Sequence, residues 1–489
     1  EDRLRRTGDR ATSGRRAAVS GDQEVVRITP SWPETAVREA LSLPAPTGSQ
    51  PITFSAISTD SRTLKQGALF VALTGERFDG HDHLTAAANA GASGAVVRKG
   101  TPEVPGLVLF PVEDTLRAYG QLARARRRSI SGPVVAITGT NGKTSTKEML
   151  AAVLGTRYQT YATRANLNNL VGVPQTILEA PSDTEALIVE AGANLPGEIA
   201  RYREIIEPSI AIVTNAVAGH LEGFGSLAGV VAEKLSLTDQ VPLAIVGTDP
   251  PTLAEGARRR ARQVRTAGLR DADLIPERVT LDETARPVVT VRGYTFRLAA
   301  RGLHQADNAI RVWAAAEALG IDPELARAAL EQFSIPGGRG ELLQEGQLTI
   351  LNDCYNANPQ SFRAAIATAA ALRQDRRLVF VAGTMRELGT DSEALHREIG
   401  EALVDLHPEL LAVVGDFVPA LAPYAGALRH RLITAPDPIA LGPLLAQHLR
   451  GDELVILKAS RGVALERILP ALKARAKHTP PSGAPLHPR

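Results

Sequence analysis

One short loop holds the residue types best suited to chemistry on phosphate. It occupies positions 139–145 and reads Gly-Thr-Asn-Gly-Lys-Thr-Ser. The β-branched run at 134–138 predicts a buried strand before the loop, and apolar spacing predicts a helix from about Thr144. Backbone N–H groups in such a loop face inward, Lys143 adds a positive charge, and a hydroxyl is available to Mg²⁺. The alternative is a glycine turn that only links strand to helix. The predicted phosphate-binding residues are Gly139, Thr140, Asn141, Gly142, Lys143, Thr144 and Ser145.

Further polar residues stand where open α/β sheets place their ligands. Glu190 ends an apolar run that predicts a strand, and carboxylate oxygens are ligands that Mg²⁺ prefers. A later loop carries Asn166, Asn168 and Asn169, whose amides can donate and accept hydrogen bonds to a peptide or a phosphate. A plain loop is the alternative for this second segment. These residues predict a site for metal and peptide beside the phosphate loop.

Length and composition limit the class of protein. A chain of 489 residues suggests roughly three domains. A net charge of +2 and an aromatic content of 4% give no case for a nucleic-acid partner. The single Cys354 excludes an intrachain disulfide framework and a multi-cysteine zinc site. Because no apolar run approaches the length of a membrane span and no secretory h-region is found, we expect a cytoplasmic protein without membrane insertion.

Strands and helices alternate along the chain, so we predict an α/β fold with three domains. In the last domain, strands predicted at 348–352, 378–382, 410–414 and 453–457 alternate with Ala- and Leu-rich helices, which favours a Rossmann-like parallel sheet. The predicted units are a disordered tail at 1–25, a small α/β domain at 26–131, a central domain with a P-loop ATPase-type parallel sheet at 132–336, a Rossmann-like domain at 337–477, and a tail at 478–489.

The motifs together resemble the Mur ligase family of ATP-dependent, amide-forming ligases. After the glycine loop they follow in collinear order along most of the chain. They include the Asn-rich loop, the run His-Leu-Glu-Gly-Phe-Gly-Ser from His220, and the run Asp-Cys-Tyr-Asn-Ala-Asn-Pro from Asp353. In the first domain, the run Ser-Thr-Asp-Ser-Arg from Ser58 is similar to the nucleotide-sugar domain of the family. The resemblance implies the three domains named above.

The resemblance also implies an activity, because the motifs agree best with family members that add D-alanyl-D-alanine. Such a ligase uses ATP to join D-alanyl-D-alanine to the terminal carboxylate of a UDP-N-acetylmuramoyl-tripeptide. The reaction passes through an acyl phosphate and belongs to the cytoplasmic synthesis of peptidoglycan precursors. A monomer is expected, and the third residue of the peptide stays open as lysine, ornithine or diaminopimelate.

Metal and catalytic roles follow from the resemblance residue by residue. Two Mg²⁺ ions are implied, held by Thr144, Glu190, His220 and a carbamylated Lys234. A carbamate turns a cationic amine into a two-oxygen anion, and its formation requires an unprotonated amine and therefore a depressed pKa. The alternative for Lys234 is a solvated helix lysine. The implied catalytic residues are Lys143, His220, Lys234 and Arg339.

Nucleotide and substrate contacts are also implied by the resemblance. For the nucleotide they are His304, Asn308, Arg339 and Asp353, beside the phosphate loop. For the substrates they are Ser61 and Arg62 on the UDP part, Asn166, Asn168, Asn169, Tyr355 and Asn356 on peptide or nucleotide, and Lys458, Ser460 and Arg461 on a carboxylate.

Three positions depart from the family pattern, namely Gln305 in place of Asn, Cys354 in place of Ser, and Thr384 in place of Asp. Two alternatives to the implied activity stay open. One is another amide ligase of the same superfamily, such as the enzyme that adds the third peptide residue or a folylpolyglutamate synthetase. The chain lacks the Asp-Asn-Pro-Arg motif of the former, and the latter lacks a nucleotide-sugar domain. The other alternative is a non-catalytic ATP-binding scaffold.

Overall fold

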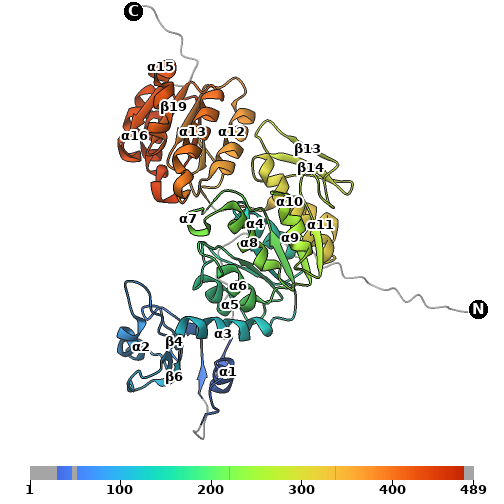
Figure 1. The fold of residues 1–489 in the computed structure, drawn as a ribbon, viewed down its shortest axis with the longest axis vertical. Helices are drawn as coiled ribbons and strands as arrows, with labels where there is room; N and C mark the ends of the chain where they lie inside the picture. The colour runs from blue at the N-terminus through green and yellow to red at the C-terminus, as the bar shows by residue number, and fades with distance from the viewer. Residues whose placement is uncertain (1–29, 47–51, 220, 336, 478–489) are drawn as a thin grey trace, which may run out of the picture.

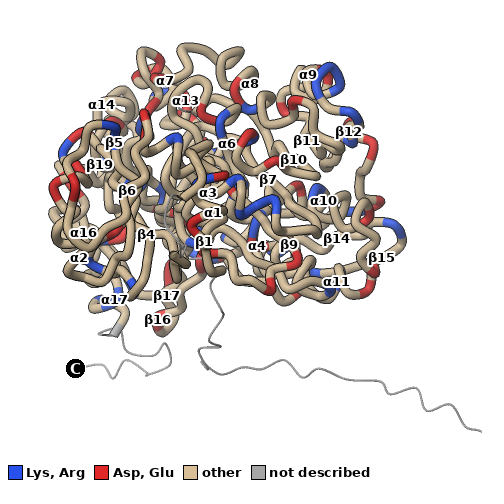
Figure 2. Tube along the Cα trace, turned by 90° about the horizontal axis from the view of Figure 1, so that it is seen from below, with Lys and Arg blue, Asp and Glu red and all other residues tan. Residues whose placement is uncertain are grey.

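Three α/β units follow one another along the long axis of the molecule (Figure 1). The computed structural model describes residues 30–46, 52–219, 221–335 and 337–477. The two predicted tails and His220 lie outside these described residues. Within them, no helix is both long and apolar enough to cross a membrane. Acidic and basic residues alternate over the trace, as Figure 2 shows.

The N-terminal unit is built on a small parallel sheet with the order β3-β4-β5-β6. Short apolar runs make these strands, and helix α2 (Leu84–Asn89) packs Leu84 and Ala87 against them. The strands are β3 (Ile57–Ser58), β4 (Leu69–Val71), β5 (Gly94–Arg98) and β6 (Val108–Val112). Because all four run parallel, the loops after β3, β4 and β5 meet at one edge of the sheet.

Helix α3 (Thr115–Arg128) joins this unit to the next one. The Asp114 side chain caps it by accepting from two backbone N–H groups. The buried Arg126 guanidinium donates to the carbonyls of Ala180 (3.0 Å) and Pro181 (2.7 Å), just beyond helix α5 (Gly172–Leu178). Arg127 donates to the Ile206 carbonyl at the end of α6 (Glu198–Ile206), and Arg124 and Arg128 form ion pairs with the Glu207 carboxylate. These contacts fasten α3 to the central unit.

The central unit contains a six-stranded parallel sheet with the order β12-β11-β10-β7-β9-β8. Helices cover both faces, which is why the strands at 134–138, 186–190, 210–213 and 243–246 are continuous apolar runs rather than alternating ones. The predicted buried face of α4 is confirmed, since Met149, Leu150, Val153 and Leu154 are all fully buried. The strands are β7 (Val134–Thr138), β8 (Thr160–Ala162), β9 (Ala186–Glu190), β10 (Ile210–Val213), β11 (Leu243–Val246) and β12 (Gln263–Thr266).

One face of this sheet carries α4 (Lys143–Leu154) and α10 (Leu303–Ala318), and the other carries α3, α5 and α6. A three-stranded antiparallel sheet follows, made of β13 (Arg278–Leu281), β14 (Pro287–Val291) and β15 (Tyr294–Arg297). The sequence predicted this antiparallel pairing around Gly293. In Figure 1 the small sheet lies beside helix α12 of the C-terminal unit.

The C-terminal unit holds a second six-stranded sheet with the order β16-β17-β21-β18-β19-β20. Its four predicted strands are confirmed, and all of them run parallel. Two edge strands were not predicted, β16 and β20. The strands are β16 (Glu341–Glu345), β17 (Leu348–Asp353), β18 (Leu378–Ala382), β19 (Leu410–Val414), β20 (Leu432–Ala435) and β21 (Leu454–Lys458).

Strand β16 is a departure from the predicted all-parallel sheet, because it pairs antiparallel with β17 through a tight turn at Gly346. Helix α12 (Pro359–Arg373) covers one face of the sheet with α13 (Ser392–Asp405), and α16 (Pro438–His448) covers the other. Helix α12 begins directly after β17, so its first turn lies at the carboxyl edge of the sheet.

Candidate active site between the central and C-terminal units

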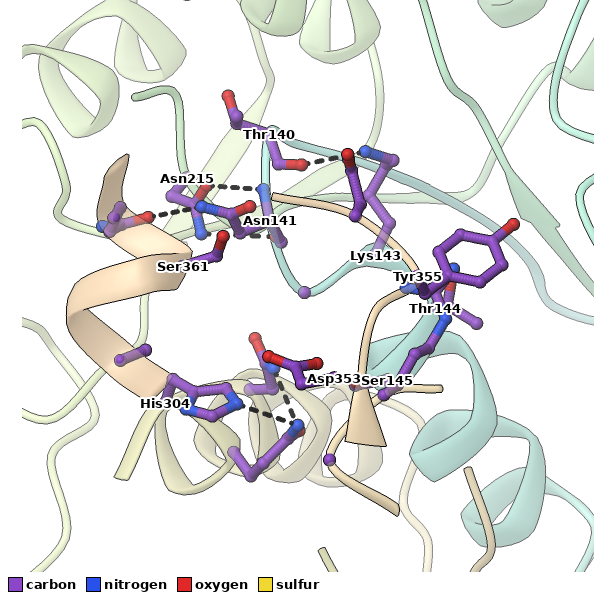
Figure 3. Close-up of a pocket in the computed structure, with 18 of the residues that line it drawn as sticks. Thr140, Asn141, Lys143, Thr144, Ser145, Asn215, His304, Asp353, Tyr355 and Ser361 are labelled. Carbon is purple, nitrogen blue, oxygen red and sulfur yellow. Dashed lines mark hydrogen bonds between the residues drawn. The ribbon is translucent and has the colours of Figure 1, made fainter. Parts of the chain in front are cut away.

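A cavity of about 390 Å³ lies where the central and C-terminal units meet. The phosphate loop, the first turn of α10, the end of β17 and helix α12 form its walls, and Figure 3 shows them around one open space. Most of the residues predicted for phosphate, nucleotide and peptide line it together. These are Thr140, Asn141, Gly142, Lys143, Thr144, Ser145, Asn168, Asn169, Glu190, His304, Asn308, Arg339, Asp353, Tyr355, Asn356 and Lys458.

The phosphate loop is held from the neighbouring strand β10. The Asn141 backbone N–H donates to Asn215 Oδ1 at 3.0 Å, and Thr214 Oγ1 donates to the Asn141 carbonyl at 2.6 Å. Gly139 requires glycine, since its φ is 145° and an added Cβ would lie 1.9 Å from Thr214 Oγ1. The Lys143 Nζ folds back onto the Gly139 carbonyl at 2.7 Å. Contacts within the central unit therefore hold the loop in this conformation.

Glu190 and its neighbours offer oxygen ligands beside the loop. The Thr144 hydroxyl donates to Glu190 Oε2 and the Asn168 amide donates to Glu190 Oε1, both at 2.9 Å. Glu190 is only 2% exposed. Among the described residues, no group of three or more His, Cys, Asp or Glu side chains could hold a metal ion alone. A hydroxyl and a carboxylate fit a Mg²⁺ ion that takes its remaining ligands from phosphate and water. His220, the third predicted ligand, lies outside the described residues.

Lys234, on α8 (Leu227–Leu235), is buried but does not line the cavity. Its Nζ lies 5.2 Å from the centroid of the Phe224 ring. Burial, followed by the charge of Lys143, lowers the pKa of Lys234 to about 7. The reading as a solvated lysine is therefore wrong, and the lowered pKa meets the requirement for carbamylation. The carbamate itself and its metal stay predictions.

The nucleotide end of the cavity shows what the departure at Gln305 does. Its amide bridges the two residues that keep the family pattern, with Nε2 3.1 Å from His304 Nε2 and Oε1 3.4 Å from Asn308 Nδ2. Gln305 itself is buried and lines the cavity. The Gln305 side chain, which is longer than that of Asn, thus bends toward His304 and Asn308 and contacts both. Gln305 therefore orients the side chains of His304 and Asn308.

The segment after β17 brings the C-terminal unit into the site. Asp353 forms an ion pair with Lys458 at 2.7 Å, and the Lys458 Nζ also donates to the Asn356 carbonyl at 2.8 Å. The Arg339 guanidinium carbon lies 3.7 Å from the centroid of the Tyr355 ring, and the Tyr355 N–H donates to the Gly338 carbonyl. These contacts fix Asp353 and Arg339 at the cavity wall.

Some predicted substrate residues lie outside this cavity. Asn166 is exposed and does not line it. Ser460 Oγ accepts from the Arg386 N–H at 2.9 Å, and Arg461 pairs with Glu466 at 3.0 Å, so both are engaged within the C-terminal unit. Their role toward a carboxylate stays a prediction. Cys354 is buried, as expected for a small filler.

Ser61 and Arg62 lie in the N-terminal unit, far from the phosphate loop along the chain and absent from the cavity wall. Arg62 is 85% exposed and forms a two-point ion pair with Asp60 at 2.8 Å. These hydrogen bonds lower the pKa of Asp60 to about 2. A second, open cavity of about 560 Å³ lies at the same sheet edge and is lined by His81, Arg98 and Lys99 among others.

Sequence reasoning did not select several residues of the site. Asn215 holds the phosphate loop, Arg301 lines the nucleotide end, and Gln360 and Ser361 open helix α12 against the loop. The polar end of strand β10 was a signal for Asn215. For Gln360 no signal existed, because its partner Asn141 is 219 residues away in sequence.

Each unit matches a domain of one family. Residues 53–127 match the Mur ligase family catalytic domain, residues 137–316 the Mur ligase middle domain, and residues 338–461 the Mur ligase glutamate ligase domain. The chain is 36% identical over 436 residues to the UDP-N-acetylmuramoyl-tripeptide–D-alanyl-D-alanine ligase of Escherichia coli, covering 86% of this chain and 94% of that protein. It is 33% identical over 425 residues to the ligase of the same name from Bacillus subtilis, covering 84% and 92%.

Solved structures agree with these matches. A crystal structure of MurF from Acinetobacter baumannii superposes with a TM-score of 0.82 at 29% identity, covering 91% of this chain and all of that one. MurF ligase from Thermotoga maritima in complex with ADP superposes with a TM-score of 0.76 at 27% identity, covering 86% and 98%. Three matched domains, relatives above 30% identity over nearly their full length, and a cavity built from the shared motifs lead to one conclusion: the chain belongs to the Mur ligase family.

Proposed function

We propose that this protein is an ATP-dependent ligase that joins D-alanyl-D-alanine to the terminal carboxylate of a UDP-N-acetylmuramoyl-tripeptide. We further propose that it acts in the cytoplasm as a monomer. The observation that carries the proposal is the single cavity in which the phosphate loop of the central unit faces Asp353, Tyr355 and Arg339. The relatives that share this arrangement along nearly their whole length bear that activity in their names.

The first step brings together the peptide carboxylate and the triphosphate of ATP, which repel each other because both are anions. A tripeptide carboxylate oxygen attacks the γ-phosphorus of ATP, the bond to the β-phosphate oxygen breaks, and ADP leaves. The amine of D-alanyl-D-alanine then attacks the acyl carbon, the amine loses a proton, and inorganic phosphate leaves as the amide forms. Lys143 and Arg339 supply positive charge at the cavity wall, so that two anions can approach each other.

Thr144 and Glu190 would hold Mg²⁺, with His220 and a carbamylated Lys234 proposed to complete two sites. When bound, Mg²⁺ neutralises phosphate charge and draws electron density from the phosphorus. The chain's own part is to orient these groups: Asn168 and Thr144 fix both Glu190 oxygens, and the backbone of the loop is fixed by Asn215. Such preorganised groups need no rearrangement during the reaction.

For the nucleotide, His304 and Asn308 would face the base and Asp353 the ribose. For the UDP-sugar, the N-terminal unit would supply Ser61 and Arg62. The open cavity beside them adds Arg98 and Lys99, whose positive charges suit a diphosphate. Asn169, Tyr355 and Asn356 remain candidates for the peptide.

Phosphate release from ATP tests the proposal. Purified protein is mixed with D-alanyl-D-alanine and, in parallel, with UDP-muramoyl tripeptides that end in lysine, ornithine or diaminopimelate. We expect release that requires both substrates, and the fastest tripeptide identifies the third residue. Release with a UDP-muramoyl dipeptide and a free diamino acid would move the assignment to the ligase for the third residue. ATP binding without release in any combination would favour a scaffold.

A further inference from the structure

Helix α12 rests its first turn on the phosphate loop of the other unit. Its N-cap is Asn358, which is 5% exposed. Asn358 Nδ2 donates to Asn141 Oδ1 at 2.7 Å, and Asn141 Nδ2 donates to Asn358 Oδ1 at 3.2 Å. Two side-chain amides thus pair in both directions across the boundary between the units. Figure 3 shows Asn141 turned toward α12, near Ser361.

Gln360 extends this pair to a second loop of the central unit. Its Oε1 accepts from Asn141 Nδ2 at 2.8 Å, and its Nε2 donates to Asp249 Oδ2 at 2.5 Å. The Asp249 carbonyl accepts from the Ala216 N–H, one residue after the Asn215 that holds the backbone of Asn141. Asn141 is therefore held by the central unit at its backbone and by the C-terminal unit at its side chain.

Two further contacts join the later part of α12 to the central unit. Thr368 packs so closely on Gly302 that an added Cβ at Gly302 would lie 2.6 Å from the Thr368 hydroxyl. Just past the helix end, Gln374 Nε2 donates to the Glu283 carbonyl at 3.1 Å. The contacts of Asn358 and Gln360 form only when the first turn of α12 lies against the phosphate loop, a position that we call seated. They are also the contacts of this helix that reach the phosphate loop directly.

We propose that Asn358 and Gln360 are positioning residues that couple seating of the C-terminal unit to the geometry of the phosphate loop. The four residues Asn141, Asn358, Gln360 and Asp249 form an amide latch. This inference rests on the proposed function, because it assigns the latch to a nucleotide-dependent cycle. A nucleotide that touches both units binds only the seated form, so its apparent affinity falls with the fraction of molecules that are seated.

The test exchanges donor and acceptor across the latch. Gln360→Glu removes the N–H donor and sets a carboxylate against Asp249, while Asn141 keeps its acceptor. Asp249→Asn alone leaves an oxygen that Gln360 can still donate to. Combining the two substitutions restores one donor and one acceptor with reversed direction. Because the combined variant also removes the repulsion between two carboxylates, its recovery shows that positions 360 and 249 act directly on each other.

Binding of a non-hydrolysable ATP analogue with Mg²⁺ is measured by calorimetry, and closure by small-angle X-ray scattering. We expect Gln360→Glu to weaken binding about tenfold and to keep the radius of gyration larger with the analogue present. Asp249→Asn should stay within about threefold of the starting protein, and the combined variant should recover most of the loss. Thermal unfolding midpoints should agree among all variants.

Gln374→Glu is the matched control, because it removes a contact between the units at the far end of the same helix. A loss equal to that of Gln360→Glu would overturn the positioning role and leave only general association of the units. Unchanged affinity in Gln360→Glu, or no recovery in the combined variant, would overturn the latch itself. The smaller loss in the control supports it.

Phosphate release separates this inference from the proposed function. In an active enzyme, Gln360→Glu should lower kcat more than it raises KM for the peptide substrates, because the latch acts on the phosphate loop. Protein that shows latch-dependent binding and closure but no release with any tripeptide would contradict the ligase function and keep the latch.

Discussion

Lys143 and Lys234 are two lysines of the central unit, and the charge of the first acts on the pKa of the second. Burial lowers the pKa of both ammonium groups, and the charge of Lys143 lowers that of Lys234 further. Lys143 has phosphate as its natural partner, which favours the charged form once a nucleotide binds. Lys234 has the Phe224 ring beside it and a pKa near 7. One charge therefore makes its neighbour easier to deprotonate.

Replacing Lys143 with alanine should lower kcat for phosphate release by at least about 10²-fold, because a charge aimed at the transferred phosphate is lost. The unfolding midpoint should not fall, since a partly buried cation is removed. Lys473→Ala, on the surface of α17 (Leu469–Lys477), is the control and should keep full activity. Full activity in Lys143→Ala would contradict the assignment of the loop.

Lys234 predicts a pH dependence of stability. Its folded-state pKa of about 7 lies below the ordinary lysine value of 10.5, so the unfolded state binds more protons between these values. In CO₂-free buffer, stability should therefore be lowest below pH 7 and rise toward pH 10.5. Lys234→Met should reduce this slope and leave the part that the lowered pKa of Lys143 contributes, as measured by urea unfolding across that range.

Bicarbonate distinguishes a carbamate from a free amine at the same residue. If Lys234 is carbamylated, bicarbonate near pH 8 should raise the unfolding midpoint of the protein and leave that of Lys234→Met unchanged. An equal response of both proteins would show that CO₂ acts elsewhere. Mass spectrometry under native conditions should then find the added carboxyl group only in the unaltered chain.

At the scale of elements, two helices connect the units in different ways. Helix α3 is fastened by guanidinium groups that cap the carbonyls at the ends of α5 and α6. Helix α12 is seated by side-chain amides, some of them exposed to solvent. A buried charged donor is costly to leave unpaired, whereas an exposed amide can bond to water. We therefore expect the joint at α3 to cost more free energy to open than the joint at α12.

Arg126→Ala should lower the free energy of unfolding by about 2–4 kcal/mol, because it leaves the Ala180 and Pro181 carbonyls without their buried donor. Urea unfolding followed by circular dichroism measures the change. Arg117→Ala, an exposed residue of the same helix, should stay within about 0.5 kcal/mol. Similar losses in both variants would mean that helix propensity, not the joint, sets the effect.

Features that depend on local sequence patterns could be predicted from the sequence, whereas features that depend on residues far apart in sequence could not. Strands β7 and β9 of the central sheet and four strands of the C-terminal sheet were predictable, because strands buried on both faces are unbroken apolar runs. Strands β8, β11 and β12 of the central sheet were not predicted. Strand β16 was missed because its half-exposed residues directly follow a glycine-rich segment. The phosphate loop and Glu190 were found from local patterns. Helix α12 as a wall of the cavity was not, since it depends on pairs more than 200 residues apart in sequence.

At the scale of the whole molecule, the cavity exists only while the C-terminal unit keeps its place against the central unit. Its walls come from the central unit and from α12, so opening the C-terminal unit would expose the phosphate loop to water. Water would hydrolyse an acyl phosphate, and closure protects against this loss. Gly302 is a close point of contact, because an added Cβ there would lie 2.6 Å from the Thr368 hydroxyl and 2.7 Å from the His304 ring.

Gly302→Ala should therefore hold the C-terminal unit open. With an ATP analogue bound, its radius of gyration by X-ray scattering should stay above that of the starting protein, and kcat should fall about tenfold or more. Gly293→Ala is a close control, because Gly293 has a similar φ of 80° against 89° but nothing within 4 Å of an added Cβ. An open molecule in both variants would point to backbone strain instead.

The rigid joint at α3 has a consequence for what the enzyme can accept. Because α3 is bound at the ends of both α5 and α6, we expect the separation between the cavity of the N-terminal unit and the phosphate loop to change little when the C-terminal unit moves. A substrate anchored by its UDP end must then reach the loop with its free carboxylate. Under the proposed function, a peptide one residue too short would place its carboxylate short of the γ-phosphate. A peptide one residue too long would place its carboxylate beyond it. Chain length would be selected by distance, without a pocket that reads the side chains in between.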